Sequence, residues 1–198
     1  MHVNCELMFE KYAQVFFKSN MRILEIGPWG SPSNFCRLIN NATIEWETLD
    51  ISPLDNPTYI SEDGFKFPVP DEKFDIVFSA NTIEHVKKPW VWIKEVARVT
   101  KAGGHVITIT PISWPYHEAP VDCWRIYPEG MKALYEEAGL GIVVNKFETL
   151  EATGYRKLVP GVTSVGQKKF AMHPKVIIMK LLGWPIQCAY DTITIGVK

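Results

Sequence analysis

The chain has 198 residues, 46% of them hydrophobic, which is enough to bury a core without metals or disulfides. Its formal net charge is −1, so no basic field favours nucleic acid as a partner. The four cysteines form no C-x-x-C pair, and this favours reduced thiols over a disulfide framework or a zinc site. Residues 1–10 do not resemble a signal peptide, and the apolar stretch 176–184 is too short to span a bilayer. We therefore expect a cytoplasmic protein and assign no metal ligand.

The first elements along the chain predict the start of an α/β sheet. Residues 5–17 space apolar side chains at helical intervals, so we expect an N-terminal amphipathic helix. Residues 22–26 form a strand-like run that breaks into a Gly/Pro-rich turn, and residues 33–39 then predict a helix. Residues 43–50 predict a second strand that ends in Asp50, where nucleotide-binding folds place a ribose-binding carboxylate. We interpret the turn after the first strand as a cofactor loop.

Strands and helices alternate through the rest of the chain. Further strands are expected at residues 58–60, 75–80, 105–110, 142–147 and 191–197. Helices are expected at residues 90–100, 128–138 and 174–182. The Gly-containing stretch 101–104 should stop its helix before the next strand, and the last strand should run antiparallel at an edge of the sheet. We expect one domain over residues 1–198, with the N-terminal helix within 1–20 and a lid within 151–187.

The long loop at residues 111–127 follows the carboxyl end of a predicted strand. It gathers a base, acids, a cation and aromatic faces in one stretch, from Tyr116, His117, Glu118, Asp122, Trp124 and Arg125. A loop of this length in this position is typical of a functional segment. We identify it as the candidate substrate site.

The order of these features over residues 22–140 resembles a class I S-adenosylmethionine-dependent methyltransferase. The resemblance implies a Rossmann-like three-layer sandwich, with a mostly parallel seven-stranded sheet and an antiparallel last strand, and S-adenosyl-L-methionine as the cofactor. An NAD site is disfavoured because the first turn lacks the G-x-G-x-x-G pattern. The segments that carry the resemblance are residues 24–27 (first motif), Asp50 (ribose acid), Asp63-Gly64 (adenine segment), 67–75 (run into the fourth strand) and 83–86 (post-strand signature of a small-molecule subgroup).

The resemblance also implies which residues contact the cofactor. Asp50 would accept hydrogen bonds from the ribose hydroxyls, Asp63 would accept one from the adenine amine or cap its own turn, and Gly27 would lie at the methionine end. Glu25 would contact the ligand's amino group or orient its own loop. Trp29 stands where the family usually has a glycine, so its side chain either points away from the ligand or packs over it. The expected cofactor-binding residues are Glu25, Gly27, Pro28, Trp29, Gly30, Asp50, Ile51, Asp63, Gly64, Asn81 and His85.

Methyl transfer from a sulfonium is an in-line displacement, and a sugar hydroxyl as acceptor also needs a base. His117 is the candidate base because imidazole titrates near neutrality, and a structural histidine is the alternative. Asp122 and Arg125 are candidates either for catalysis or for an ion pair that holds the loop. The spaced set that resembles methyltransferases found with polysaccharide-building enzymes is His117, Pro120, Asp122, Trp124, Arg125, Tyr127, Pro128 and Gly130.

The expected function is therefore an O-methyltransferase that acts on a sugar or glycan hydroxyl. One alternative is a methyltransferase of another small metabolite. The other is a non-catalytic cofactor-binding module, which Trp29 in the glycine loop motivates. The expected partner is a sugar or small-molecule substrate, with no nucleic acid and no membrane insertion, and the chain could be part of a larger glycan-building protein.

Overall fold

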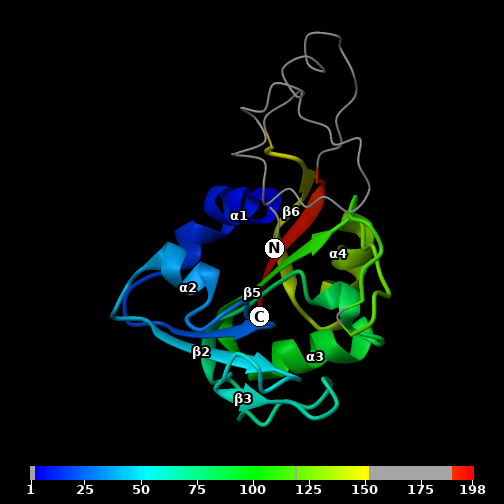
Figure 1. Cartoon of the computed structure of the whole chain (residues 1–198). Coiled ribbons are helices and arrows are strands. Elements are labelled where there is room, and N and C mark those ends of the chain that lie inside the picture. The colour runs from blue at the N-terminus through cyan, green and yellow to red at the C-terminus, as the bar shows by residue number, and fades with distance from the viewer. Residues whose placement is uncertain (1–2, 119, 152–188) are drawn as a thin grey trace, which may run out of the picture.

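The computed structural model describes residues 3–118, 120–151 and 189–198, and within them seven strands form one sheet in the order β3-β2-β1-β4-β5-β7-β6 (Figure 1). The strands are β1 Arg22–Ile26, β2 Glu45–Asp50, β3 Tyr59–Ile60, β4 Phe74–Ala80, β5 Thr100–Pro111, β6 Gly141–Glu148 and β7 Asp191–Val197. All seven predicted strands are present. The expected lid and the helix expected at 174–182 lie outside the described residues.

Helices cover both faces of the sheet, with α1 and α2 on one face and α3 and α4 on the other (Figure 1). The helical segments are α1 Val3–Met8, η1 Phe9–Ala13, η2 Gln14–Phe16, α2 Asn34–Ile39, η3 Ile83–His85, α3 Pro89–Val99 and α4 Pro128–Glu137. This arrangement confirms the three-layer fold. Among the described residues, no helix has the length and apolarity needed to cross a bilayer.

The N-terminal segment differs from the single helix expected at residues 5–17. It begins as an α-helix, continues as one π-helical stretch and ends in a 3-10 turn. Cys5, Met8, Phe9 and Ala13 are all fully buried against the sheet. The π-helical stretch keeps these side chains on the buried face, because it shifts the spacing between successive apolar residues.

The last strand runs antiparallel, as expected, but it does not lie at an edge. β7 pairs antiparallel with both β5 and β6, and β6 is the edge strand. Thr192 and Thr194 are as buried as Ile193 and Ile195 between them. The alternation of Thr and Ile is thus not a solvent-facing pattern but that of an interior strand covered on both faces.

The stretch 101–104 was expected to separate a helix from a strand, and this is wrong. β5 already begins at Thr100, which pairs with Phe74, and the register then jumps so that His105 pairs with Ile76. Residues 101–104 therefore form a bulge inside β5, where Gly103 takes a φ of +76°. A glycine supplies this backbone conformation at little cost.

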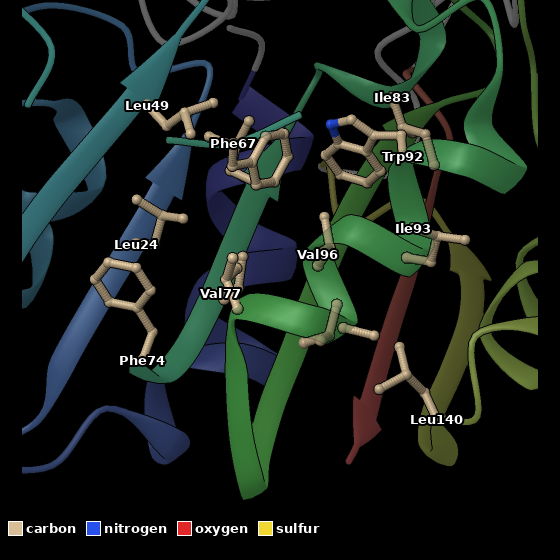
Figure 2. Packing of buried hydrophobic residues seen from close by; sticks show 14 of the residues in the cluster. Leu24, Leu49, Phe67, Phe74, Val77, Ile83, Trp92, Ile93, Val96 and Leu140 are labelled. Atoms are coloured by element: carbon tan, nitrogen blue, oxygen red, sulfur yellow. The ribbon is translucent and has the colours of Figure 1, made fainter. Parts of the chain in front are cut away.

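The core between the sheet and α3 extends to the carboxyl ends of the parallel strands. Figure 2 shows Leu49, Phe67 and Trp92 at the end of the cluster toward which β1 and β2 run, with Phe74 and Leu140 at the other end. All five side chains are almost fully buried. The packed core thus forms a floor beneath the strand ends, where such sheets bind ligands.

Candidate functional site

A cavity of about 840 Å³ opens at the carboxyl ends of β1, β2 and β4. The candidate base His117 lines it, but Gly30, Asp122 and Arg125 do not. The expected cofactor-binding residues that line it are Glu25, Gly27, Pro28, Trp29, Asp50, Ile51, Asp63, Gly64, Asn81 and His85. The fold thus brings together strand-end residues that are far apart in sequence.

Glu25 is 2% exposed and lies at the end of β1. Its Oε2 accepts hydrogen bonds from the Ser33 hydroxyl and from Trp46 Nε1, the latter at 2.8 Å. Ser33 in turn caps α2, because its hydroxyl accepts a hydrogen bond from Cys36 N. Burial raises the pKa of Glu25 to about 7, and the two hydrogen bonds only partly offset this. Glu25 therefore orients its own loop and also faces the cavity, so both readings of its role are compatible with its position.

Gly27 is required by the geometry of the first turn. Its φ is +72°, and a Cβ atom at this position would meet Thr82 Oγ1 at 2.4 Å. Thr82 Oγ1 donates a hydrogen bond to Ile26 O, which ties the end of β1 to the turn after β4. The backbone of this loop can therefore approach a ligand closely.

Trp29 and Gly30 take different places in the same loop. Trp29 is 69% exposed and lines the cavity. Gly30 has a φ of +82° and donates its N–H to Asp55 Oδ2 at 3.2 Å, away from the cavity. The glycine therefore shapes the turn, and the tryptophan takes the position beside the ligand space.

Asp50 and Asp63, the two acids expected to bind the nucleoside part of the cofactor, both line the cavity. Asp50 Oδ1 accepts a hydrogen bond from Ser52 N at 2.8 Å, and burial raises the pKa of Asp50. Asp63 Oδ1 accepts hydrogen bonds from Phe65 N and Lys66 N, and these lower the pKa of Asp63. Asp63 therefore caps its own turn, as one reading predicted, and still lines the ligand space.

The turn η3 after β4 carries buried polar groups. Asn81 adopts a φ of +53°, and its Oδ1 is buried without a hydrogen-bond partner among the described residues. Glu84 is fully buried, and neither carboxylate oxygen has such a partner. Burial raises the pKa of Glu84 to about 8 and lowers the pKa of His85, whose Nδ1 bonds Val121 O.

The loop at residues 111–127, called the substrate loop below, docks on η3 through hydrogen bonds from its backbone N–H groups. Glu84 O accepts hydrogen bonds from Cys123 N at 2.8 Å and from Trp124 N at 3.1 Å. Trp124 Nε1 donates to Val86 O at 2.8 Å. The docking brings the loop residue His117 against His85, with the ring centroids 4.9 Å apart.

Asp122 and Arg125 form a bidentate ion pair, with N–O distances of 2.5 and 2.7 Å. Arg125 also donates to Trp114 O at 3.2 Å. Asp122 Oδ2 accepts a hydrogen bond from His117 N at 2.9 Å. Mainly because of Arg125, the pKa of Asp122 falls to about 2. Since neither partner lines the cavity, their position favours the reading of an ion pair that holds the loop.

Sequence reasoning missed several cavity residues. Trp92 is buried in the core and also forms part of the cavity wall. Glu84 lies in the segment 83–86 that carries the resemblance but was given no role of its own, although an acid in the turn that follows a buried strand is a usable signal. The missed residues that line the cavity include Phe65, Phe67, Thr82, Glu84, Trp92 and Trp114.

The chemistry of these residues fits S-adenosylmethionine. Glu25 can accept from an ammonium group, Asp50 from two ribose hydroxyls, and Asp63 lies beside an apolar wall that suits an adenine. The buried, unpartnered Oδ1 of Asn81 and the cradle at Gly27, which a Cβ would fill, are features that a ligand would explain. The fold is thus of the doubly wound α/β class, and the residues that line its cavity suit a nucleoside cofactor.

Comparisons with known proteins narrow this class. Residues 38–108 match a family described as a methyltransferase domain. An uncharacterized methyltransferase of Mycolicibacterium paratuberculosis is 29% identical over 93 residues. That alignment covers 41% of this chain and 36% of the relative, so the chain spans about a third of the length of this curated relative.

Two solved structures share the fold over 98% of this chain. A SAM-dependent methyltransferase from Archaeoglobus fulgidus superposes with a TM-score of 0.61 at 19% identity, over 94% of its own length. The [4+2]-cyclase SpnF superposes with a TM-score of 0.64 at 15% identity, over 80% of its length. The comparisons thus show similarity to a methyltransferase domain over residues 38–108, and a shared fold with the two solved structures over nearly the whole chain.

Proposed function

We propose that this protein transfers the methyl group of S-adenosylmethionine to a hydroxyl group of a sugar or glycan. The observation that carries the proposal is one cavity that joins the strand-end acids Glu25 and Asp50 to the imidazole of His117. The acids suit the cofactor, and the imidazole suits an acceptor that must lose a proton.

The hydrogen bonds of His117 fit it for the role of base. Its Nδ1 lies 3.1 Å from Pro115 O and 3.3 Å from Asp122 Oδ2. Both neighbours are acceptors, so we assign the ring proton to Nδ1, and Nε2 keeps its lone pair. The ion pair of Asp122 with Arg125 fixes the carboxylate that orients the ring.

The bound cofactor supplies an electrophilic methyl group on a sulfonium. His117 Nε2 would accept the hydroxyl proton as the acceptor oxygen takes the methyl group that the cofactor supplies. Glu25 and Asp50 hold the donor, and the buried wall of Phe67 and Trp92 keeps water from one side of the cavity.

Aromatic side chains in the same loop support a sugar as the acceptor. Trp114 lines the cavity together with His117, and the partly exposed aromatic side chains of Tyr116 and Trp124 lie on the same loop outside the cavity lining. Aromatic faces combined with hydrogen-bonding groups suit the apolar faces and hydroxyls of a sugar ring. The resemblance of the loop to methyltransferases of polysaccharide building points the same way.

The acceptor class can be tested with cofactor that carries a labelled methyl group. The protein is incubated with panels of glycosides, phenols and amines, and label transfer is measured. We expect transfer to glycosides. Transfer to phenols or amines alone would contradict the sugar proposal and favour another small metabolite. Calorimetry that detects no cofactor binding would overturn every enzymatic reading, and binding without turnover would favour a non-catalytic module.

The role of the base can be tested with His117→Ala. We expect turnover to fall by about 10²-fold or more, because a positioned base contributes on that scale. Cofactor affinity should stay nearly unchanged, since His117 faces the acceptor. Glu118→Ala is the matched control, because Glu118 is the exposed neighbour and does not line the cavity. Equal turnover of the two variants would show that His117 is not the base.

A further inference from the structure

Three potential metal-ligating side chains gather at the acceptor end of the cavity. Glu84 and His85 come from η3, and His117 comes from the substrate loop. Each offers one ligand atom, and these three atoms lie within 4.8 Å of one another. Atoms on opposite sides of a metal ion with bonds of about 2.1 Å lie about 4.2 Å apart. A small movement of the loop residue His117 would therefore bring the three atoms to ligand distances.

In both His85 and His117, the ring nitrogen Nδ1 contacts an oxygen acceptor, as is usual in histidines that bind a metal through Nε2. His85 Nδ1 bonds the carbonyl oxygen of Val121. His117 Nδ1 lies 3.1 Å from Pro115 O and 3.3 Å from Asp122 Oδ2. A histidine that binds a metal through one nitrogen usually donates its other N–H to a carbonyl or a carboxylate. Both rings therefore keep an Nε2 lone pair for a ligand.

Glu84 provides an independent reason to expect a cation. Its side chain is fully buried, it borders the cavity, and neither carboxylate oxygen has a hydrogen-bond partner among the described residues. The nearest basic atom is His85 Nε2, 3.7 Å from Oε1, which is too far for a hydrogen bond. A buried carboxyl group without a partner is costly unless a ligand satisfies it.

We propose that Glu84, His85 and His117 bind one divalent transition-metal ion beside the methyl acceptor. Two imidazoles and one carboxylate favour Zn²⁺, Fe²⁺ or Co²⁺ over Mg²⁺ and Ca²⁺, which prefer oxygen ligands. The three protein ligands leave open coordination positions toward the cavity. With the ion bound, an acceptor oxygen in such a position would lose its proton to water more easily, and the Nε2 lone pair of His117 would bind the metal, so the metal site is an alternative to the role of base proposed above for the same atom.

The site can be tested with Co²⁺ on the untagged, full-length protein after treatment with a chelator. The visible absorption of Co²⁺ reports its binding, and the absence of an intense near-ultraviolet thiolate band separates this site from the cysteines. We expect one Co²⁺ per chain, displaced by Zn²⁺. Glu84→Gln and His117→Gln should each weaken Co²⁺ binding by at least about tenfold, while Glu118→Gln leaves it unchanged.

Glu84→Gln and His117→Gln are chosen because neither substitution is expected to unfold the protein. Glu84→Gln keeps the size of a buried side chain, and His117→Gln changes a half-exposed loop residue, so circular dichroism can confirm the fold of each. The proposal fails if the wild-type chain shows no saturable Co²⁺ binding, or if both variants bind Co²⁺ as the wild-type chain does.

Binding of Co²⁺ is independent of the proposed function, whereas the role of the ion at the acceptor rests on that function. Methyl transfer by a chain that does not bind Co²⁺ would overturn the metal site alone. Saturable Co²⁺ binding at this cluster without methyl transfer to any acceptor would overturn the proposed function alone.

Discussion

The buried carboxyl group of Glu25 makes a quantitative prediction about stability and pH. Its pKa rises from 4.5 to about 7 on folding, mainly because of burial. The folded state therefore binds more protons than the unfolded state between these values, and this residue lowers the free energy of unfolding as the pH rises through that window. The shift of about 2.5 pKa units corresponds to a cost of about 3 kcal/mol at pH 8, at ~1.4 kcal/mol per unit.

Glu25→Gln should remove this cost. Ser33 and Trp46 both donate to the one oxygen Oε2, so the amide oxygen of glutamine can keep both hydrogen bonds. Urea unfolding of the cofactor-free protein, followed by tryptophan fluorescence, gives the free energy of unfolding at pH 5 and pH 8. We expect the variant to gain about 2–3 kcal/mol over wild type between these two pH values.

The same substitution should weaken cofactor binding by about tenfold or more in calorimetry, because an ammonium group loses its carboxylate partner. Glu10→Gln, at an exposed position of η1, is the control for both measurements. A stability difference between Glu25→Gln and wild type that does not change with pH would refute the reasoning about burial.

Two further substitutions test the turn and the core. Gly27→Ala should lower both stability and cofactor affinity, because its Cβ would overlap Thr82, whereas Gly103→Ala shares the positive φ but meets no atom within 4 Å. We expect thermal unfolding and calorimetry to show a larger loss of stability and cofactor affinity for Gly27→Ala than for Gly103→Ala. Equal losses would mean that the backbone strain at positive φ, and not the overlap with Thr82, causes the effect. Tyr135→Phe should cost about 1–2 kcal/mol of unfolding free energy in urea, since the fully buried hydroxyl makes two hydrogen bonds. Tyr116→Phe, at an exposed position, should cost nearly nothing.

The strands were predictable from the sequence, but their order was not fully so. Short apolar runs such as residues 75–80 identify buried strands by composition alone. The place of β7 depends on its pairing with β5 and β6, which no local pattern encodes. An edge position was therefore expected for residues 191–197, although the sheet buries even Thr192 and Thr194.

The cofactor end of the site was more predictable than the acceptor end. Asp50 and Asp63 stand at or just after the ends of predicted strands, and parallel strands end at the same edge of the sheet. Glu84 was given no role of its own, because the residues that dock on its backbone carbonyl oxygen, Cys123 and Trp124, lie far along the chain. Contacts of this kind follow from tertiary docking and leave no mark in residue spacing.

The position of β7 also determines which strand edge becomes exposed when the sheet unfolds locally. Within the part of the chain that the structure describes, β6 joins the sheet only through β7, and β7 is the neighbour that covers the outer side of β5. Local detachment of β7 would therefore release β6 and expose the backbone of β5 along Val106, Ile107 and Ile109. An apolar strand with a free edge is a template for pairing with another chain. Aggregation on mild heating should thus begin with the loss of β7, at the side of the sheet away from the cofactor loop.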